Sequence, residues 1–372
     1  MNLKTCSLKE TAHYKVHGRT DEARYPLPLI FNGSSVEVNV TGSELWIDIE
    51  TDYDVYEPWV WTAINGAFIS RQMLPPGSQS LCLFRGMNPD TVKNVKFIRE
   101  TQPMSDNGEC SVSVKGFQSD GSFLPVPDRP LKLEFIGDSI TSGEGTYGAK
   151  ADEDWLSMYM SSSRSYPVMV SDALNADYRL FSQGGWGVLC GWDNNPRHNI
   201  PSRYEMLCGP DGGESGKKPA LDKPYDFESW QPDAIIVNLG TNDAGAFDQP
   251  SWQDPESGEI FCQRRDPDGA CNEEDLSRFK QAVIDFLAML RRNNPSAHIL
   301  WVYGMLGCSL SSAINDAVNS YCNQSGDGNT AFLQLPDTTE ETTGSRAHPG
   351  PGSHAGTAGI LTEYLKKKLN LS

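Results

Sequence analysis

The pattern of apolar residues changes at about residue 130, and this change limits the folds that the chain can adopt. Before it, short runs alternate apolar and polar residues and are separated by turn residues, as in strands that bury one face. These runs are 35–40, 44–50, 59–64, 80–86, 92–98 and 110–117. We therefore expect residues 1–125 to fold as an all-β sandwich, which is followed by the proline-rich linker 125–130.

After the linker, compact apolar runs alternate with runs that have a helical period. We expect strands at 131–136, 177–182, 233–239, 298–304 and 330–335, and helices at 165–174, 273–292, 311–322 and 354–369. This alternation predicts a parallel sheet covered by helices, an α/β fold, over residues 126–372. The active site of such a sheet lies at the carboxyl ends of its strands, so the residues that follow each strand are the candidates.

Two turns that follow expected strands offer a nucleophile and donors for an oxyanion. The turn 137–141 (GDSIT) presents the hydroxyl of Ser139 at the end of the first strand of the α/β half, beside backbone N–H groups that can stabilise an oxyanion. The turn 183–187 (QGGWG) follows the second strand, and its glycines let a backbone N–H approach a bound atom closely. A helix cap and a tight turn are the simpler explanations of these two segments.

Two further segments offer a donor and a base. The segment 240–243 (GTND) follows the third strand, and the side-chain amide of Asn242 can donate to an oxyanion. His348 begins the segment 348–354 (HPGPGSH) before the last helix, where a rigid turn can hold an imidazole as general base. Taken singly, the first segment could be a helix cap and the second could hold a surface histidine. All four segments occur in chain order at strand ends, however, and together they predict a site for nucleophilic catalysis.

The series GDSIT, GGWG, GTND and HP resembles the four motif blocks of the SGNH (GDSL) hydrolases, over roughly residues 131–369. The resemblance implies a flavodoxin-like, three-layer fold around the parallel sheet, and an enzyme without metal or cofactor. It also implies that Ser139 is the nucleophile and His348 the base. The backbone N–H of Ser139, Gly185 and Asn242 would then form the oxyanion hole.

The upstream β region and the run LEFIGDSITSGEG resemble carbohydrate esterase family 2 more specifically, as do the segments 84–97 and 301–307. The enzymes of that family join a jelly-roll sandwich to an SGNH domain and remove acetyl groups from plant cell-wall polysaccharides. The resemblance therefore implies a serine esterase that acts on acetylated polysaccharide or oligosaccharide through an acyl-enzyme.

The region before His348 departs from the superfamily pattern. An Asp usually stands two or three residues before this His, but Arg346 and Ser345 occupy those positions here. We expect a Ser–His dyad in which a backbone carbonyl orients the imidazole; the carboxylates that could substitute are Asp337, Glu340 and Glu341. We also expect the base to be His348, because His354 lies where the last helix begins.

The net charge of −18 at pH 7 argues against nucleic acid and anionic membranes as partners, and no apolar run approaches the length of a membrane span. Aromatic rings among polar loop residues are typical of sugar-binding surfaces, and the candidates are Trp186, Trp192, Trp230 and Trp252. We expect a monomer. Two alternatives stay open: a lipase or thioesterase of the same superfamily that acts on longer acyl chains, and a carbohydrate-binding protein whose hydrolase half is weak.

The nine cysteines favour an oxidising compartment, because several lie at short spacings in turn-rich loops. We expect at least three disulfides in the α/β half, among them the pairs Cys190/Cys208, Cys262/Cys271 and Cys308/Cys322. Glycosylation sequons stand at Asn32, Asn39, Asn323 and Asn370. These features predict a secreted glycoprotein whose leader is absent from this chain, because the first residues carry no apolar signal sequence.

Overall fold

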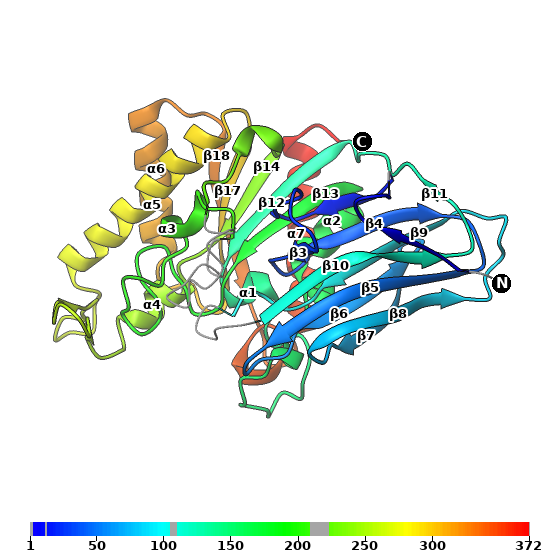
Figure 1. The fold of residues 1–372 in the computed structure, drawn as a ribbon. Helices are drawn as coiled ribbons and strands as arrows, with labels where there is room; N and C mark the ends of the chain where they lie inside the picture. Colours follow the sequence, from blue (N-terminus) through cyan, green and yellow to red (C-terminus); the bar gives the residue numbers. More distant parts are fainter. Residues whose placement is uncertain (1–2, 12, 105–109, 209–222, 372) are drawn as a thin grey trace.

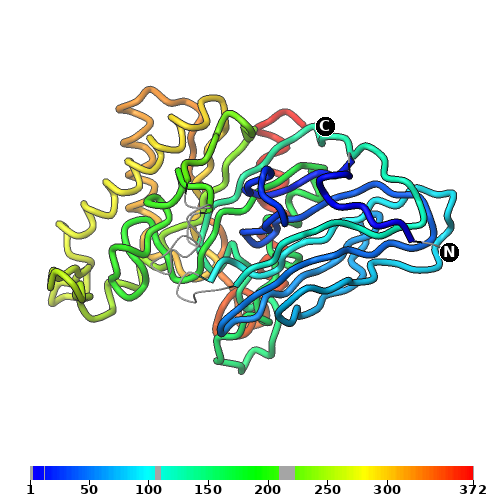
Figure 2. Tube along the Cα trace, in the orientation of Figure 1, coloured from blue at the N-terminus to red at the C-terminus, as the bar shows by residue number. Residues whose placement is uncertain are grey.

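The structure, a computed structural model, describes residues 3–11, 13–104, 110–208 and 223–371. It has an antiparallel β-sandwich followed by a layered α/β unit, and the two lie side by side (Figures 1 and 2). The predicted fold class is therefore confirmed.

The sandwich consists of two sheets whose inner faces enclose one apolar core. Its strands are β1 (Lys4–Ser7), β2 (Lys15–His17), β3 (Leu27–Leu29), β4 (Ser35–Val40), β5 (Glu44–Tyr53), β6 (Trp59–Ile64), β7 (Ala67–Met73), β8 (Gly77–Arg85), β9 (Lys93–Arg99), β10 (Cys110–Ser119) and β11 (Phe123–Leu124). One sheet has the order β1-β10-β5-β8 with β3 on β10, and the other has the order β11-β4-β9-β6-β7 with β2 on β4. Alternate residues of β5, namely Leu45, Ile47 and Ile49, point into the core, as the period of two predicts.

The α/β unit is built on one five-stranded parallel sheet. Its strands are β12 (Leu131–Gly137), β13 (Ala176–Ser182), β14 (Ala234–Asn238), β17 (His298–Met305) and β18 (Thr330–Asp337). The order β13-β12-β14-β17-β18 is the doubly wound order of flavodoxin-like folds. The order reverses between β12 and β14, so the crevice for a ligand lies at the carboxyl ends of these two strands.

Helices cover both faces of the parallel sheet (Figure 1). The helices are α1 (Ser139–Ser142), α2 (Tyr166–Ala173), α3 (Pro201–Tyr204), α4 (Thr241–Ala246), α5 (Glu273–Asn293), α6 (Ser311–Ser325) and α7 (Pro351–Lys368), and an antiparallel pair, β15 (Trp252–Gln253) and β16 (Ile260–Phe261), lies in the loop after α4. Ile235 and Val237 of β14 pack with α5 and α6, whereas Ile236 packs with α2 and α7. Burial on both faces explains why β14 is apolar throughout.

A network of polar contacts joins the sandwich to the edge of the parallel sheet at β13. Arg129 of the linker donates to Glu37 of β4 and to Asp177 of β13, at 3.0 and 2.8 Å. His17 contacts Glu37 at 2.6 Å, and Lys15 pairs with Asp177. Burial favours the neutral form of Glu37, but the hydrogen bonds from His17 and Arg129 hold its pKa well below the ordinary value. The two units are thus held in a fixed arrangement, in which the sandwich can contribute to the site.

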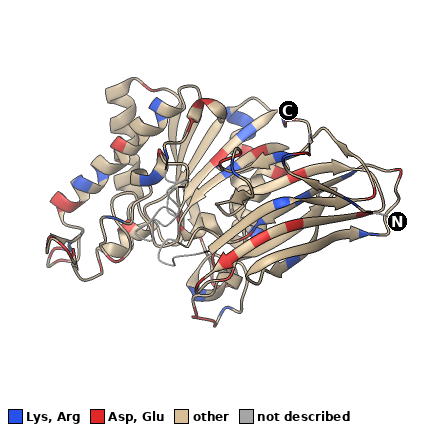
Figure 3. Ribbon diagram, in the orientation of Figure 1, with Lys and Arg blue, Asp and Glu red and all other residues tan. Residues whose placement is uncertain are grey.

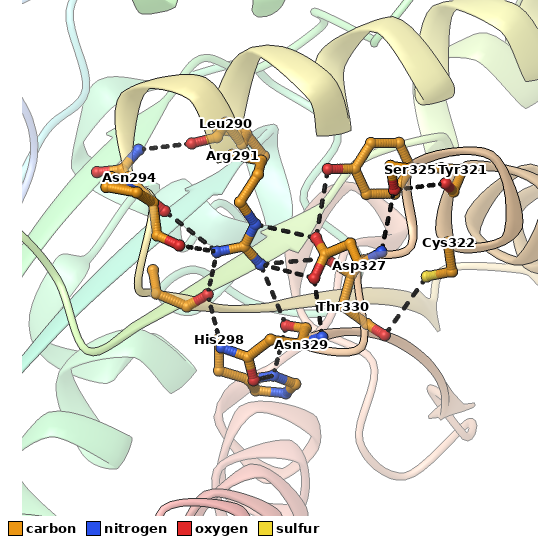
Figure 4. A network of polar contacts seen from close by, with 12 residues as sticks. Leu290, Arg291, Asn294, His298, Tyr321, Cys322, Ser325, Asp327, Asn329 and Thr330 are labelled. Carbon is orange, nitrogen blue, oxygen red and sulfur yellow. Dashed lines mark hydrogen bonds and ion pairs between the residues drawn. The ribbon is translucent and has the colours of Figure 1, made fainter.

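A second polar network lies at the amino ends of β17 and β18, on the side of the sheet away from β13 (Figure 4). Arg291 of α5 pairs with Asp327 at 2.9 Å and donates to the carbonyl of Ala297, just before β17. Nδ1 of His298 donates at 2.9 Å to the carbonyl oxygen of Asn329, just before β18. This network connects the loops that precede β17 and β18, and it lies at the end of the sheet away from the candidate catalytic residues.

The expectation of loop-closing disulfides is wrong. All nine cysteines lie in the described part of the chain, and none of them forms a disulfide. The Sγ of Cys190 lies 3.6 Å from Nε2 of Gln263, and that of Cys322 lies 3.7 Å from the carbonyl oxygen of Thr330. Disulfide geometry requires Cα atoms within about 7 Å and converging Cβ atoms. Spacing along the chain does not set this geometry.

Candidate active site

Ser139 occupies the first turn after β12, at the carboxyl edge of the sheet. The Oδ1 of Asp138 caps α1 by accepting from the N–H of Ile140 at 3.0 Å, which starts the helix at Ser139. Gly137 is required just before it, because a Cβ there would lie 2.0 Å from Oγ1 of Thr141. The sequence GDSIT therefore forms a tight turn that places the Ser139 hydroxyl at the strand ends.

His348 lies against Ser139 from the loop that joins β18 to α7. Its Nε2 is 3.0 Å from Oγ of Ser139, and its Nδ1 is 2.9 Å from the carbonyl oxygen of Arg346. A carbonyl oxygen can only accept, so Nδ1 carries the proton and Nε2 is the acceptor that faces the hydroxyl. This tautomer is the one that a general base needs.

His354 is excluded from this place by its burial in the helix layer. It stacks on the ring of Tyr166 with a centroid separation of 6.0 Å, and its Nδ1 accepts from the N–H of Tyr166 at 3.2 Å. Burial, and to a smaller extent the charge of His348, lowers the pKa of His354 to about 3. The His354 ring is therefore a neutral part of the packing between α2 and α7.

The three carboxylates that could have replaced the missing Asp have partners elsewhere. Asp337 accepts from the N–H of Gly307 at 2.9 Å, Glu341 accepts from Oγ1 of Thr339, and Glu340 pairs with Lys150 at 3.5 Å. The carboxylate near the imidazole belongs instead to Glu144, whose Oε1 lies 3.9 Å from Nε2 of His348.

Sequence reasoning missed Glu144. The signal that it offered is the run Gly143-Glu144-Gly145, in which both glycines adopt positive φ, of 80° and 81°. Two such glycines turn the chain back toward the strand ends, and they place the side chain between them at the site.

Gly185 and Asn242 border the same pocket as Ser139 and His348. Gly185, with φ of 80°, lies in the turn after β13, and its carbonyl accepts from the N–H of Trp192 at 3.1 Å. Asn242, in the first turn of α4, donates through Nδ2 to the carbonyl of Trp186 at 2.9 Å, and the same nitrogen lies 3.3 Å from Oδ2 of Asp138. The predicted nucleophile, base and oxyanion donors are thus gathered at one edge of the sheet.

Two buried carboxyl groups support this edge. Asp243 accepts from the N–H groups of Val188, Leu189 and Cys190, at 2.9, 2.8 and 3.2 Å, and so ties the loop after β13 to α4. Burial raises the pKa of Asp243 to about 6, although these hydrogen bonds favour its charged form. Burial likewise raises the pKa of Asp138 to about 7.

The pocket has a volume of about 480 Å³ and is lined by both halves of the chain. Tyr56 and Met104 come from the sandwich, and Trp155 packs edge-on against Tyr56 with a centroid separation of 4.3 Å. Gln183, Glu144 and Arg346 supply polar groups. Sequence reasoning did not identify Tyr56 or Trp155, because their positions depend on how the sandwich packs on the hydrolase half.

Of the four tryptophans proposed to bind sugar, Trp192 lines the pocket and is 52% exposed. The other three do not line it. Trp186 is buried and stacks on His198, with ring centroids 5.3 Å apart. Trp230 packs on Arg179 ahead of β14, at the amino end of the sheet, and Trp252 packs on Arg197. Their positions in polar loops did not distinguish packing from ligand binding.

A family model, described as GDSL-like Lipase/Acylhydrolase family, matches residues 135–355. The cellulase/esterase CelE of Acetivibrio thermocellus is 27% identical in an alignment of 357 residues that covers 91% of this chain; the chain spans 37% of CelE. An acetylxylan esterase/glucomannan deacetylase of Cellvibrio japonicus is 27% identical over 364 residues, which cover 95% of this chain and 88% of that protein.

Solved structures extend the similarity over the whole chain. The acetyl xylan esterase Est2A of the rumen bacterium Butyrivibrio proteoclasticus superposes with a TM-score of 0.97 at 53% identity, covering 100% of both chains. A family two carbohydrate esterase of Clostridium thermocellum, in complex with cellohexaose, superposes with a TM-score of 0.79 at 26% identity, covering 96% of this chain and 100% of that one.

Proposed function

The chain belongs to the GDSL-like lipase/acylhydrolase family, and we propose that it is a serine esterase that removes acetyl groups from plant cell-wall polysaccharide or oligosaccharide. The observation that carries the proposal is the 3.0 Å contact between Nε2 of His348 and Oγ of Ser139, in a pocket that also holds Gly185 and Asn242. The similarity to acetylxylan esterases supports the choice of substrate.

In the reaction, His348 takes the proton of the Ser139 hydroxyl as Oγ bonds to the carbonyl carbon of the acetyl ester. The oxyanion that forms is stabilised by the N–H groups of Ser139 and Gly185 and by Nδ2 of Asn242. The proton then passes from His348 to the sugar oxygen as the C–O bond breaks, which leaves acetyl-Ser139. Water, activated by the same imidazole, hydrolyses this acyl-enzyme to acetate and the free hydroxyl.

The lining of the pocket favours an acetyl group over a long acyl chain as the group removed, because Glu144, Gln183 and Arg346 would place polar groups against a longer apolar chain. Trp192 on one side and the Tyr56–Trp155 pair offer aromatic surfaces against which sugar rings can pack. We assign Trp192 to substrate binding.

The test is the release of acetate from acetylated xylan and acetylated glucomannan, with Ser139→Ala as the control. We expect acetate release by the wild-type protein and a loss of at least about 10³-fold in kcat for the variant. Preference for an aryl decanoate over an aryl acetate would instead identify a lipase. The absence of both turnover and a burst of product from an activated acetate would identify a carbohydrate-binding protein.

We further propose that the sandwich, residues 1–125, and the hydrolase unit, residues 126–372, are separate domains. The support is that β1–β11 pair in two antiparallel sheets while β12–β14, β17 and β18 form the parallel sheet. A secreted monomer is the state that we propose for the protein, since its polymeric substrate lies outside the cell. The excess of 18 negative charges favours a neutral polymer over nucleic acid, and acidic and basic residues are interspersed over both halves (Figure 3).

No helix in the described ranges is long and apolar enough to cross a membrane. Among the sequons, Asn323 and Asn370 are exposed and could carry glycans. Asn32 is buried and accepts from Oγ of Ser182 at 3.0 Å, so this sequon is not accessible in the folded protein.

A further inference from the structure

Two consecutive residues before the base adopt the left-handed backbone conformation, which residues other than glycine rarely do. Arg346 has φ of 53° and ψ of 35°, and Ala347 has φ of 52°. For a residue with a Cβ this conformation is strained, and it persists only where the surrounding structure holds it.

The strained turn is what orients His348. The carbonyl of Arg346 accepts from Nδ1–H of His348 at 2.9 Å, in the role that a carboxylate has in related enzymes. If the turn relaxed to an ordinary conformation, this carbonyl would point elsewhere and Nε2 would lose its alignment with Ser139. The position of the base therefore depends on whatever keeps Arg346 left-handed.

Glu144 holds the side chain of Arg346. Its Oε1 is 3.2 Å from Nε of Arg346, and neither atom has a hydrogen-bond partner among the described residues, so they meet as an ion pair. Glu144 is only 4% exposed, and its own N–H donates at 3.0 Å to the carbonyl of Ser139. The carboxylate is thus fixed to the turn that carries the nucleophile, and it reaches across to the turn that carries the base.

We propose that Glu144 is a positioning residue, whose ion pair with Arg346 holds the left-handed turn that orients His348. Glu144 thereby does through Arg346 what the missing Asp would do by direct contact with the imidazole. The inference rests on the proposed function, because it assumes that His348 acts on Ser139.

The test uses the fact that glycine adopts positive φ without strain. Arg346→Ala removes the ion pair and keeps the strain, so we expect kcat on an aryl acetate to fall about tenfold or more, with KM within about twofold. Arg346→Gly removes the ion pair and also the strain at position 346, and it should recover most of the kcat that Arg346→Ala loses.

The second part of the test measures whether the effects of substitutions at Glu144 and Arg346 depend on each other. Glu144→Gln should lower kcat about tenfold in the wild-type background and less than about twofold in the Arg346→Gly background, because there is no ion pair left to break. Glu340→Gln is the matched control: it breaks the exposed Lys150–Glu340 pair beside the same loop, and kcat should not change. Circular dichroism checks that each variant is folded.

The proposal is overturned if Arg346→Ala and Arg346→Gly lose the same activity, since the side chain would then not be holding the turn. It is also overturned if Glu144→Gln raises KM and the loss persists with Arg346→Gly, since Glu144 would then act on the substrate. Should Arg346→Ala fail to fold, the coupling between Glu144→Gln and Arg346→Gly still shows whether Glu144 acts through Arg346. Ser139→Ala tests the proposed function separately from the role of Glu144. If that variant retains activity, the proposed function itself is refuted, whatever the result at Glu144.

Discussion

Gly145→Ala should displace the base without removing any catalytic group. Gly145 has φ of 81°, and a Cβ built on it would lie 2.5 Å from Cβ of His348 and 2.9 Å from the carbonyl oxygen of Ser345. Carbon atoms in contact lie about 3.5–4.0 Å apart, so His348 would have to move by about 1 Å. A displacement of this size can cost about 10²-fold in rate, so we expect kcat on an aryl acetate to fall by about that factor.

The matched control is Gly326→Ala. Gly326, which ends α6, has φ of 74°, and a Cβ there would meet no atom within 4 Å. Both variants introduce left-handed strain of about 1–2 kcal/mol, which urea unfolding measures. Gly326→Ala should therefore lose stability and keep its kcat, whereas Gly145→Ala should lose both. A Gly145→Ala variant that keeps more than half of the wild-type kcat would refute the assignment of His348 as base or the tightness of this contact.

Three further predictions concern the nucleophile, the pocket wall and the buried histidine. Ser139→Ala and His348→Ala should each lower kcat by at least about 10³-fold and the double variant no further, because the pair acts as a unit; losses that multiply would contradict a dyad. Trp192→Ala should raise KM about tenfold, roughly 1.4 kcal/mol, for an acetylated oligosaccharide but leave an aryl acetate unaffected, and equal effects on both substrates would exclude sugar stacking. For His354, burial lowers the pKa from 6.5 to about 3, so the unfolded chain binds a proton below pH 6.5 that the folded chain does not, and stability falls as the pH drops through this range. His354→Gln should therefore lose roughly 2 kcal/mol less than the wild type between pH 6.5 and 4.5, as followed by urea unfolding, and parallel pH curves would show that His354 is not the cause.

The sequence predicted those elements whose periodicity is imposed by burial. The strands β4, β6 and β14 agree with the expected bounds to within one residue, because burial of one or both faces of a strand gives a clear pattern of apolar residues in the sequence. β7 was missed because it is an edge strand whose residues are mostly exposed, so no core constrains them. The helix α1 was missed as an element because it has only four residues, too few to show a period.

The candidate site was predictable where it depends on local sequence, and unpredictable where it depends on packing. Ser139, Asn242 and His348 follow strand ends, and the sheet topology brings strand ends together. The contact between Glu144 and Arg346 could not be predicted from local sequence, since the two residues are about two hundred positions apart in the chain. Of the four tryptophans only Trp192 lines the pocket, because composition does not say which loop faces it.

The sandwich completes the hydrolase pocket. Gln102, in the segment after β9, accepts at 2.8 Å through Oε1 from the N–H of Gly184, and so fixes the turn that presents Gly185. Glu100, just before it, is buried and accepts from the hydroxyls of Ser161, Ser162 and Ser163, which lie between the nucleophile turn and α2. Tyr56 and Met104 then form part of the pocket wall. The turn that carries Gly185 therefore has its outer support in a different fold unit, so the geometry of the site depends on the docking of the two halves as much as on the motifs.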